Sequence, residues 1–125
     1  MCSREGGVKL IRKYGEYRVD MLPNLKDGRG TIEVVNFFNS EDFAGMGRLY
    51  GISIIHPGDS IGRHTHINEQ EAYYILEGVA TYDDNGTEAT LYPGDLSICR
   101  DGESHAIRND GEADLKYMAL ISYTK

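Results

Sequence analysis

The four histidines of this chain are its most informative residues, and two of them stand one residue apart. His64 and His66 flank Thr65. On a helix this spacing would turn the two rings to nearly opposite sides, whereas on a strand both side chains project from the same face. Two imidazoles on one face of a strand can chelate a metal ion, but a His-x-His pair also occurs simply as a polar strand face. The pair alone leaves both interpretations open.

A carboxylate follows this pair in the sequence. Glu71 lies five residues after His66, an odd offset that would turn it to the opposite face of one continuous strand. A turn over residues 67–70 would instead let Glu71 begin a neighbouring strand and face the histidines. Two imidazoles and one carboxylate on adjacent strands suit a divalent transition metal. His105 could supply a fourth ligand, which spacing alone does not show.

Glycine and proline divide the rest of the chain into short pieces. The 125 residues include 15 Gly and 3 Pro, and the pieces between them are rich in Val, Ile, Tyr, Phe and Thr, which favour strands. Segment 69–76 has residues that also favour a helix, but Tyr73-Tyr74-Ile75 favours a strand that ends before Gly78. Many short strands are typical of a sandwich or barrel with little helix. The expected strands also cover residues 8–12, 16–22, 31–38, 48–55, 79–82, 87–92, 96–99, 105–109 and 115–123, with one helical turn at 40–43 and an Asn-Gly hairpin turn at 85–86.

The glycines around the histidines complete two longer motifs. In order and spacing, the first resembles the first motif of the cupin superfamily, and its residues are Gly58, His64, His66, Glu71 and Gly78. The second resembles the second cupin motif, and its residues are Gly94, Arg100, Gly102, His105 and Asn109. Arg100 stands where the family usually has proline. The spacer over residues 79–93 is similar to the short spacers of compact microbial cupins.

The resemblance implies an all-β fold, a single-domain cupin-type antiparallel β-barrel of the jelly-roll kind with little helix. One domain would cover residues 1–125, with the motif-bearing core at 58–109. By motif position, one divalent transition metal ion would be held by His64, His66, Glu71 and His105. This ligand set accepts Fe, Mn, Ni, Co, Cu or Zn. Coordination positions left open would be available to water or to a chelating substrate.

Residues near the expected ligands would form the wall of a substrate pocket. Strand alternation turns Tyr73 and Ile75 to the same side as Glu71, and turns Ile107 to the same side as His105. We expect Tyr73, Ile75 and Ile107 to line a partly apolar pocket, as in most small-molecule sites. The Tyr73 hydroxyl is the candidate catalytic group, as a hydrogen-bond donor or an acid. The alternative is that Tyr73 packs in the core with its hydroxyl satisfied.

Three further motif residues have expected structural roles. Gly78 and Gly102 occupy positions where tight turns need a positive φ or the absence of a Cβ. Asn109 would form local hydrogen bonds that hold the strand carrying His105.

The overall charge limits the classes of partner. Lys and Arg number 13 against 20 Asp and Glu, a formal net charge of −7, which argues against nonspecific nucleic-acid binding and against docking on anionic membranes. No apolar run approaches the ~20 residues of a membrane-spanning helix, and the first residues lack an apolar signal-peptide core, so we expect a cytoplasmic protein. Cys2 and Cys99 are expected to be reduced. The strands within 8–38 lie outside the motif-bearing core, and we expect them to form the contacts of a homodimer.

These observations favour a metal-dependent enzyme acting on a small oxygenated molecule, by dioxygenase, isomerase or epimerase, decarboxylase or lyase chemistry. The alternative is a noncatalytic module that binds a metal or a small molecule. Four matching ligand positions favour the enzyme, whereas neither the fold nor the ligand set chooses among the reactions.

Overall fold

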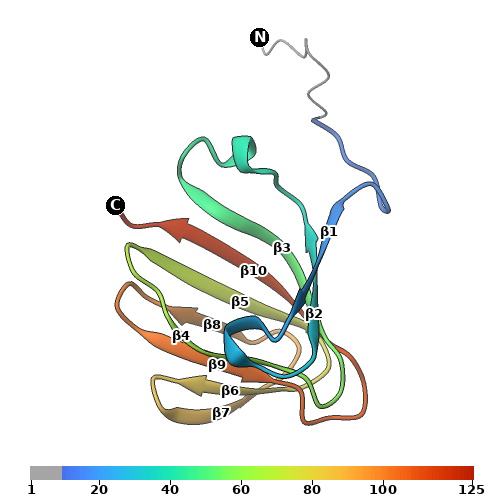
Figure 1. The fold of residues 1–125 in the computed structure, drawn as a ribbon, viewed down its shortest axis with the longest axis vertical. Helices are drawn as coiled ribbons and strands as arrows, with labels where there is room; N and C mark the ends of the chain where they lie inside the picture. Colours follow the sequence, from blue (N-terminus) through green and yellow to red (C-terminus); the bar gives the residue numbers. More distant parts are fainter. Residues whose placement is uncertain (1–9) are drawn as a thin grey trace.

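A computed structural model describes residues 10–125, and over this range the chain is built almost entirely of antiparallel strands (Figure 1). The described residues form ten strands and two short 3-10 helices. The strands are β1 (Arg18–Pro23), β2 (Thr31–Asn36), β3 (Gly47–Ile55), β4 (Ser60–Thr65), β5 (Glu69–Glu77), β6 (Ala80–Asp84), β7 (Thr87–Leu91), β8 (Leu96–Cys99), β9 (Ser104–Arg108) and β10 (Leu115–Tyr123), and the 3-10 helices are η2 (Leu25–Asp27) and η3 (Ser40–Phe43).

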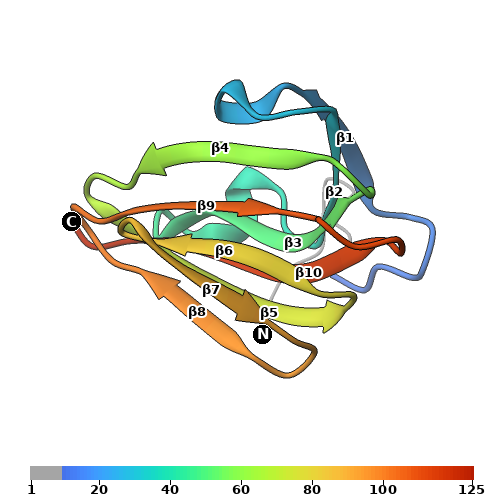
Figure 2. The same cartoon turned by 90° about the horizontal axis from the view of Figure 1, so that it is seen from below.

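The strands form two sheets. The larger has the order β1-β2-β3-β10-β5-β8 and the smaller the order β4-β9-β6-β7. Seen from below, the smaller sheet lies across the larger one, so that their inner faces enclose the interior (Figure 2). This arrangement confirms the expected all-β, jelly-roll-like fold with little helix.

Alternation along the strands builds the core. In β10, Leu115, Tyr117, Ala119 and Ile121 are buried, whereas Leu120 between the last two is exposed. The same period of two recurs in β2 and β5, because a strand turns every second side chain to one face. The largest fully buried aliphatic side chains come from five strands of both sheets: Ile32, Ile55, Ile75, Ile107 and Leu115.

Several expected elements have the predicted bounds. The helical turn is at Ser40–Phe43, and strands run over Leu96–Cys99 and Leu115–Tyr123. Asn85 and Gly86 connect β6 and β7 with φ of 51° and 97°, which is the pair of positive φ values that a type I′ hairpin turn requires.

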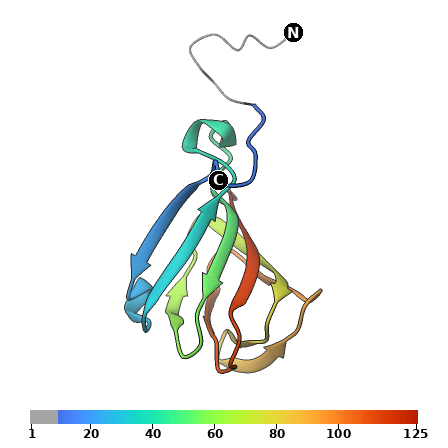
Figure 3. The same cartoon turned by 90° about the vertical axis from the view of Figure 1, so that its right-hand side faces the viewer.

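The segment before β1 differs from the prediction. A strand was expected over residues 8–12, but Leu10–Arg12 forms none, and Val8 and Lys9 lie outside the described residues. Instead of pairing in a sheet, this segment is anchored by a side chain as it approaches η3 (Figure 3). Arg12 donates a hydrogen bond of 2.8 Å to the carbonyl of Phe37 and pairs with Asp42 at 2.8 Å.

No helix in the described part of the chain has the length and apolar character needed to cross a membrane.

Candidate metal centre

The four predicted ligands come from both sheets and meet inside the barrel. His64 is near the end of β4, His66 follows that strand directly, and His105 is in β9 opposite His64. Glu71 is in β5 of the larger sheet. Its odd offset from His66 is accommodated by a turn in which Asn68 has a φ of 61°. The sequence-based expectation that Glu71 faces back toward the histidines is therefore met.

A β-bulge allows β4 to contribute both an apolar core residue and the histidine pair. Ile61 pairs with Ile107 and His64 pairs with His105, so two residues of β4 lie opposite one residue of β9. On a regular strand, Ile61 and His64 would face opposite sides of the sheet because they are three residues apart, and the bulge turns both to the same side. Gly62 lies within this bulge, and a Cβ there would collide with the carbonyl of Lys26.

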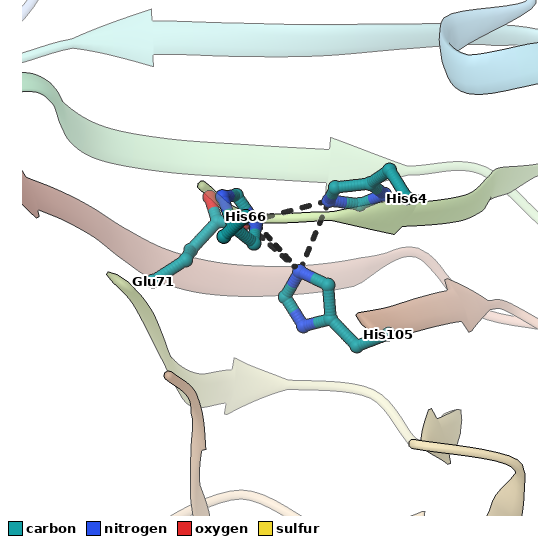
Figure 4. A group of neighbouring side chains, drawn as sticks. All are labelled: His64, His66, Glu71 and His105. Carbon is teal, nitrogen blue, oxygen red and sulfur yellow. Dashed lines mark hydrogen bonds and ion pairs between the residues drawn. The ribbon is translucent and has the colours of Figure 1, made fainter. Parts of the chain in front are cut away.

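The ligand atoms converge on one point (Figure 4). Nε2 of His105 lies 3.0 Å from Nε2 of His64 and 3.1 Å from Nε2 of His66. Oε1 of Glu71 lies 3.1 Å from Nε2 of both His66 and His105, and 3.7 Å from Nε2 of His64. All four donor atoms lie within 4.8 Å of one another.

The other ring nitrogen of each histidine is held by an oxygen atom outside the cluster. Nδ1 of His64 donates to the carbonyl of Gly62 at 2.8 Å. Nδ1 of His66 lies 2.5 Å from Oε2 of Glu69, and Nδ1 of His105 lies 2.7 Å from the hydroxyl of Tyr82. Such contacts fix the tautomer and the ring orientation of metal-ligating histidines.

This hydrogen-bond pattern tests whether a cation fits. Where Nδ1 of a neutral ring carries the proton, Nε2 presents only a lone pair. Lone pairs of three rings and a carboxylate oxygen would then point at one another, and a cation between them removes that repulsion. Two donor atoms that each lie about 2.0–2.1 Å from one ion, and that form a right angle at the ion, would be about 2.8–3.0 Å apart, close to most of the separations observed. The cluster therefore fits a metal site, with a donor set suited to a transition metal.

Burial and neighbouring side chains shift the pKa values of the cluster residues. Burial raises the pKa of Glu71, but its contacts with His105, His64 and His66 outweigh burial, so the pKa lies well below the usual range. Burial lowers the pKa of His66, and its contacts with Glu71 and Glu69 reverse that effect and raise it. Burial lowers the pKa of His105, only partly opposed by Glu71. The site thus holds its carboxylate ionised.

A salt bridge extends from the cluster to the barrel surface. Nε and Nη2 of Arg48 each lie 2.8 Å from an oxygen of Glu69, whose other contact is His66. Arg48 is the extra residue of a second bulge, because β10 pairs Ile121 with Leu49 and Ser122 with Gly47. Its hydrogen bond lowers the pKa of Glu69.

Three members of the cluster, His64, His66 and Glu71, line a cavity of about 340 Å³, whereas His105 is not among its lining residues. Tyr73 also lines this cavity, and its ring stacks on His105 with centroids 4.9 Å apart. Burial raises the pKa of Tyr73 well above its ordinary value, with a further contribution from Glu71, so the hydroxyl remains protonated. Ile75 and Ile107, the other two expected pocket residues, are packed in the hydrophobic core and are not among the described residues that line the cavity.

Motif residues outside the cluster have the expected structural roles. The side-chain amide of Asn109 donates to the carbonyls of Ile55 and Ala113, each at 2.8 Å. Gly78 and Gly102 have φ of 81° and 86°. These contacts hold the end of β9 and the turns around it.

Two other reactive side chains are separate from the cluster. Burial raises the pKa of the Cys99 thiol to about 11, so it is not an activated nucleophile. Nδ1 of His56 pairs with Asp114 at 2.8 Å on the surface. Cys2 lies outside the described residues.

Sequence reasoning did not identify Glu69 or Tyr82 as partners of the ligands. The Glu69 contact had a signal, since a carboxylate three residues after His66 can reach back across a tight turn. Tyr82 required the pairing of β6 with β9, in which Tyr82 lies opposite Ile107 and diagonal to His105.

Comparisons with known proteins agree with this architecture. An oxalate-binding protein of Thermotoga maritima is 33% identical over 115 residues, which cover 92% of this chain and 95% of the relative. A 5-nitrosalicylic acid 1,2-dioxygenase of Bradyrhizobium sp is 31% identical over 122 residues, covering 86% of this chain and 56% of that enzyme. This chain therefore spans just over half the length of the dioxygenase.

A solved structure has the same fold as this chain. A family model matches the central strands of this chain. The crystal structure of a predicted oxalate decarboxylase from Thermotoga maritima has a TM-score of 0.86 and 32% identity, covering 91% of this chain and 99% of that one. The family model described as the cupin domain matches residues 51–121. Because this match runs from β3 to β10 and includes all four residues of the cluster, the chain belongs to the cupin family.

Proposed function

We propose that this cupin holds one divalent transition metal ion through His64, His66, Glu71 and His105, and acts as a metal-dependent enzyme on a small oxygenated acid. The observation that carries the proposal is the convergence of four donor atoms beside a cavity that three of the four residues line, with Nδ1 of each imidazole already held by another group.

The charge of the ligand set favours an anionic substrate. Three neutral imidazoles and one carboxylate would leave a divalent ion with a net charge of about +1. When bound, such an ion polarises a carbonyl group, lowers the pKa of water or, as Fe²⁺, supports oxygen chemistry. The residues of the chain orient the acid, and the protonated Tyr73 hydroxyl beside Glu71 is available to donate a hydrogen bond to it.

The named ligands of the relatives support this class of substrate. Oxalate and 5-nitrosalicylic acid both present two neighbouring oxygen groups that can bind one metal ion. The relative that matches almost end to end is named as an oxalate-binding protein. That name favours the second candidate function, a noncatalytic module that binds a metal and a small acid.

Loading the full chain with Co²⁺ tests the metal site, because its visible absorption reports the coordinating atoms. We expect one Co²⁺ per chain and a change in the spectrum when oxalate is added. His105→Ala should weaken Co²⁺ binding and abolish any turnover, whereas His56→Ala, at a surface histidine, should leave both unchanged. Wild-type protein that does not bind any of the six candidate metals would contradict the proposal.

Turnover separates the enzyme from the binding module. Protein reconstituted with each candidate metal is incubated in air with oxalate and small hydroxy acids, and products are identified by mass spectrometry. Product formation that depends on the metal and on His105 supports the enzyme. Tight acid binding without turnover with any metal supports the module.

We also propose that the protein is a homodimer, with contacts from the N-terminal strands. β1 is at the edge of the larger sheet and carries two exposed apolar side chains, Val19 at 49% and Met21 at 55% exposure. Covering an exposed strand edge is one way in which proteins avoid uncontrolled pairing.

A further inference from the structure

The cavity continues well beyond the four donor atoms. It is lined by residues of β1, β2 and β3 as well as by His64, His66 and Glu71. Its volume of about 340 Å³ falls within the range of about 300–1,000 Å³ typical of sites for organic ligands. Aliphatic side chains contribute a large part of its wall: Leu22, Leu25, Val34, Leu49, Ile61 and Ile121.

Strand register places two of these aliphatic residues beside the metal cluster. Ile121 of β10 pairs with Leu49 on one side and with Glu71 on the other. All three side chains line the cavity, so a ligand with oxygen atoms near Glu71 would have its remaining atoms within reach of Leu49 and Ile121. A second apolar position, Val34, lines the cavity from β2.

The charged groups in the wall favour an acid once a metal is bound. Three basic and three acidic side chains line the cavity: Arg18, Lys26, Arg48, Asp20, Glu69 and Glu71. Their formal charges balance, so a divalent ion would give the cavity a net positive charge. An acid is therefore favoured at the metal, and an apolar group is favoured against the aliphatic wall.

We propose that the ligand of this cavity is a chelating acid with an apolar body of about the size of a six-membered ring, bound against Leu49 and Ile121. This inference rests on the proposed metal site and specifies the substrate class for it. Oxalate would occupy the metal positions but would leave the aliphatic wall in contact with water. A hydroxy acid with an aromatic body would cover that wall and release the water.

A matched pair of hydroxy acids tests the proposal. Lactate and mandelate share the same chelating group, and mandelate has a phenyl ring in place of the methyl group. Affinities for the Co²⁺-loaded full chain are measured by calorimetry, with the visible spectrum as the readout of metal coordination. We expect mandelate to bind at least tenfold more tightly than lactate, with similar spectral changes for the two acids.

Two substitutions at one position locate the apolar contact. Leu49→Asn should remove most of the preference for mandelate, and Leu49→Phe should exclude mandelate by filling the space, while both keep lactate and Co²⁺ binding. Leu120→Asn makes the same chemical change on the outer face of the larger sheet, where Leu120 is 42% exposed, and should keep the preference.

The outcomes separate this inference from the proposed function. Equal affinity of wild-type protein for lactate and mandelate would overturn the apolar subsite and leave the metal site standing. Failure of both hydroxy acids to bind while oxalate still changes the Co²⁺ spectrum would also overturn the subsite alone, whereas wild-type protein that binds none of the six candidate metals would overturn the proposed function itself. Loss of both acids in parallel in Leu49→Asn would also overturn the subsite. Should the Leu49 variants fail to fold, the wild-type comparison still decides.

Discussion

The carboxylate of Glu69 lies 2.5 Å from Nδ1 of His66, on the side of the ring away from the cluster. Glu69 is in turn held by two nitrogen atoms of Arg48. His66 is itself buried at 3% exposure, so Glu69 determines both the orientation of the ring and the nitrogen that carries its proton. The position of His66, a proposed metal ligand, thus depends on the pair of Glu69 and Arg48, which reaches the surface of the barrel.

Glu69→Gln should weaken metal binding about 10–100-fold, the usual effect of removing a hydrogen-bond partner from a metal-ligating histidine. The glutamine amide in this variant is uncharged, whereas the Glu69 carboxylate pairs with Arg48 and stabilises the His66 imidazole when that ring is bound to a cation. The measurement is the dissociation constant of Co²⁺, by competition with a chelator of known affinity.

The matched control for this variant is Glu77→Gln, on the same strand but at a solvent-exposed carboxylate that pairs with Lys116. It should bind Co²⁺ as the wild type does. Equal metal affinity in Glu69→Gln and wild type would show that the Glu69 contact does not contribute to the site.

The resemblance to the two cupin motifs was sufficient to predict the members of the cluster, whereas the spacing of the residues alone left His105 open. The strands β4, β5 and β9 bring the matched positions together. The bulges were not predictable from the sequence. Alternation from Ile61 would place His64 on the outer face, and only the pairing of β4 with β9 shows the extra residue between them. Arg48 reaches Glu69 for the same kind of reason, through the register of β3 and β10.

The pocket was harder to predict than the ligands. Strand alternation correctly predicted that Tyr73, Ile75 and Ile107 face the interior, but it does not predict how far along the barrel each side chain lies. Ile75 pairs with Tyr117 and contributes to the packed core, whereas Tyr73 lies one inward position closer to Glu71 and lines the cavity. The β1 and β2 part of the wall depends on how the larger sheet curves, which a single sequence pattern does not encode.

Two buried tyrosines provide a matched pair of hydroxyl deletions. The hydroxyl of Tyr82 contacts Nδ1 of His105 at 2.7 Å, whereas the hydroxyl of Tyr117 has no hydrogen-bond partner at bonding distance among the described residues. Tyr82→Phe should lower metal affinity about tenfold or more and cost about 0.5–1.5 kcal/mol of unfolding free energy in the metal-free protein.

Tyr117→Phe should cause little loss of thermal stability and no loss of metal affinity, because the hydroxyl it removes is buried without a partner at bonding distance and does not contact a histidine of the cluster. Thermal unfolding and Co²⁺ competition are measured on both variants. A larger loss of metal affinity in Tyr117→Phe than in Tyr82→Phe would contradict the assignment of Tyr82 as the group that positions His105.

The proposed dimer has a direct test in solution. Light scattering of the wild type should report about twice the chain mass of 14.0 kDa at micromolar concentration. Met21→Asp places a charge on the exposed face of β1 and should shift the equilibrium to the monomer. Met46→Asp makes the same change at a residue that is 71% exposed after η3 and should leave the dimer intact. A wild-type mass of one chain would remove the proposal.

The lowered pKa of Glu71 predicts how the metal-free protein responds to acid. Its carboxyl group has a lower pKa in the folded chain than the value of about 4.3 expected when unfolded, because its contacts with the three histidines outweigh burial. A lowered folded-state pKa contributes stability that is present above the unfolded value and is lost as the pH falls toward the folded value. Glu71→Gln cannot ionise, so the wild type should melt above this variant at pH 7, and the gap should narrow below about pH 4.5. Thermal unfolding in chelator from pH 7 to pH 3 measures this difference in melting temperature. The control is Glu77→Gln, which should differ little from the wild type across this pH range. A difference between wild type and Glu71→Gln that widens on acidification would contradict the ionised state of Glu71.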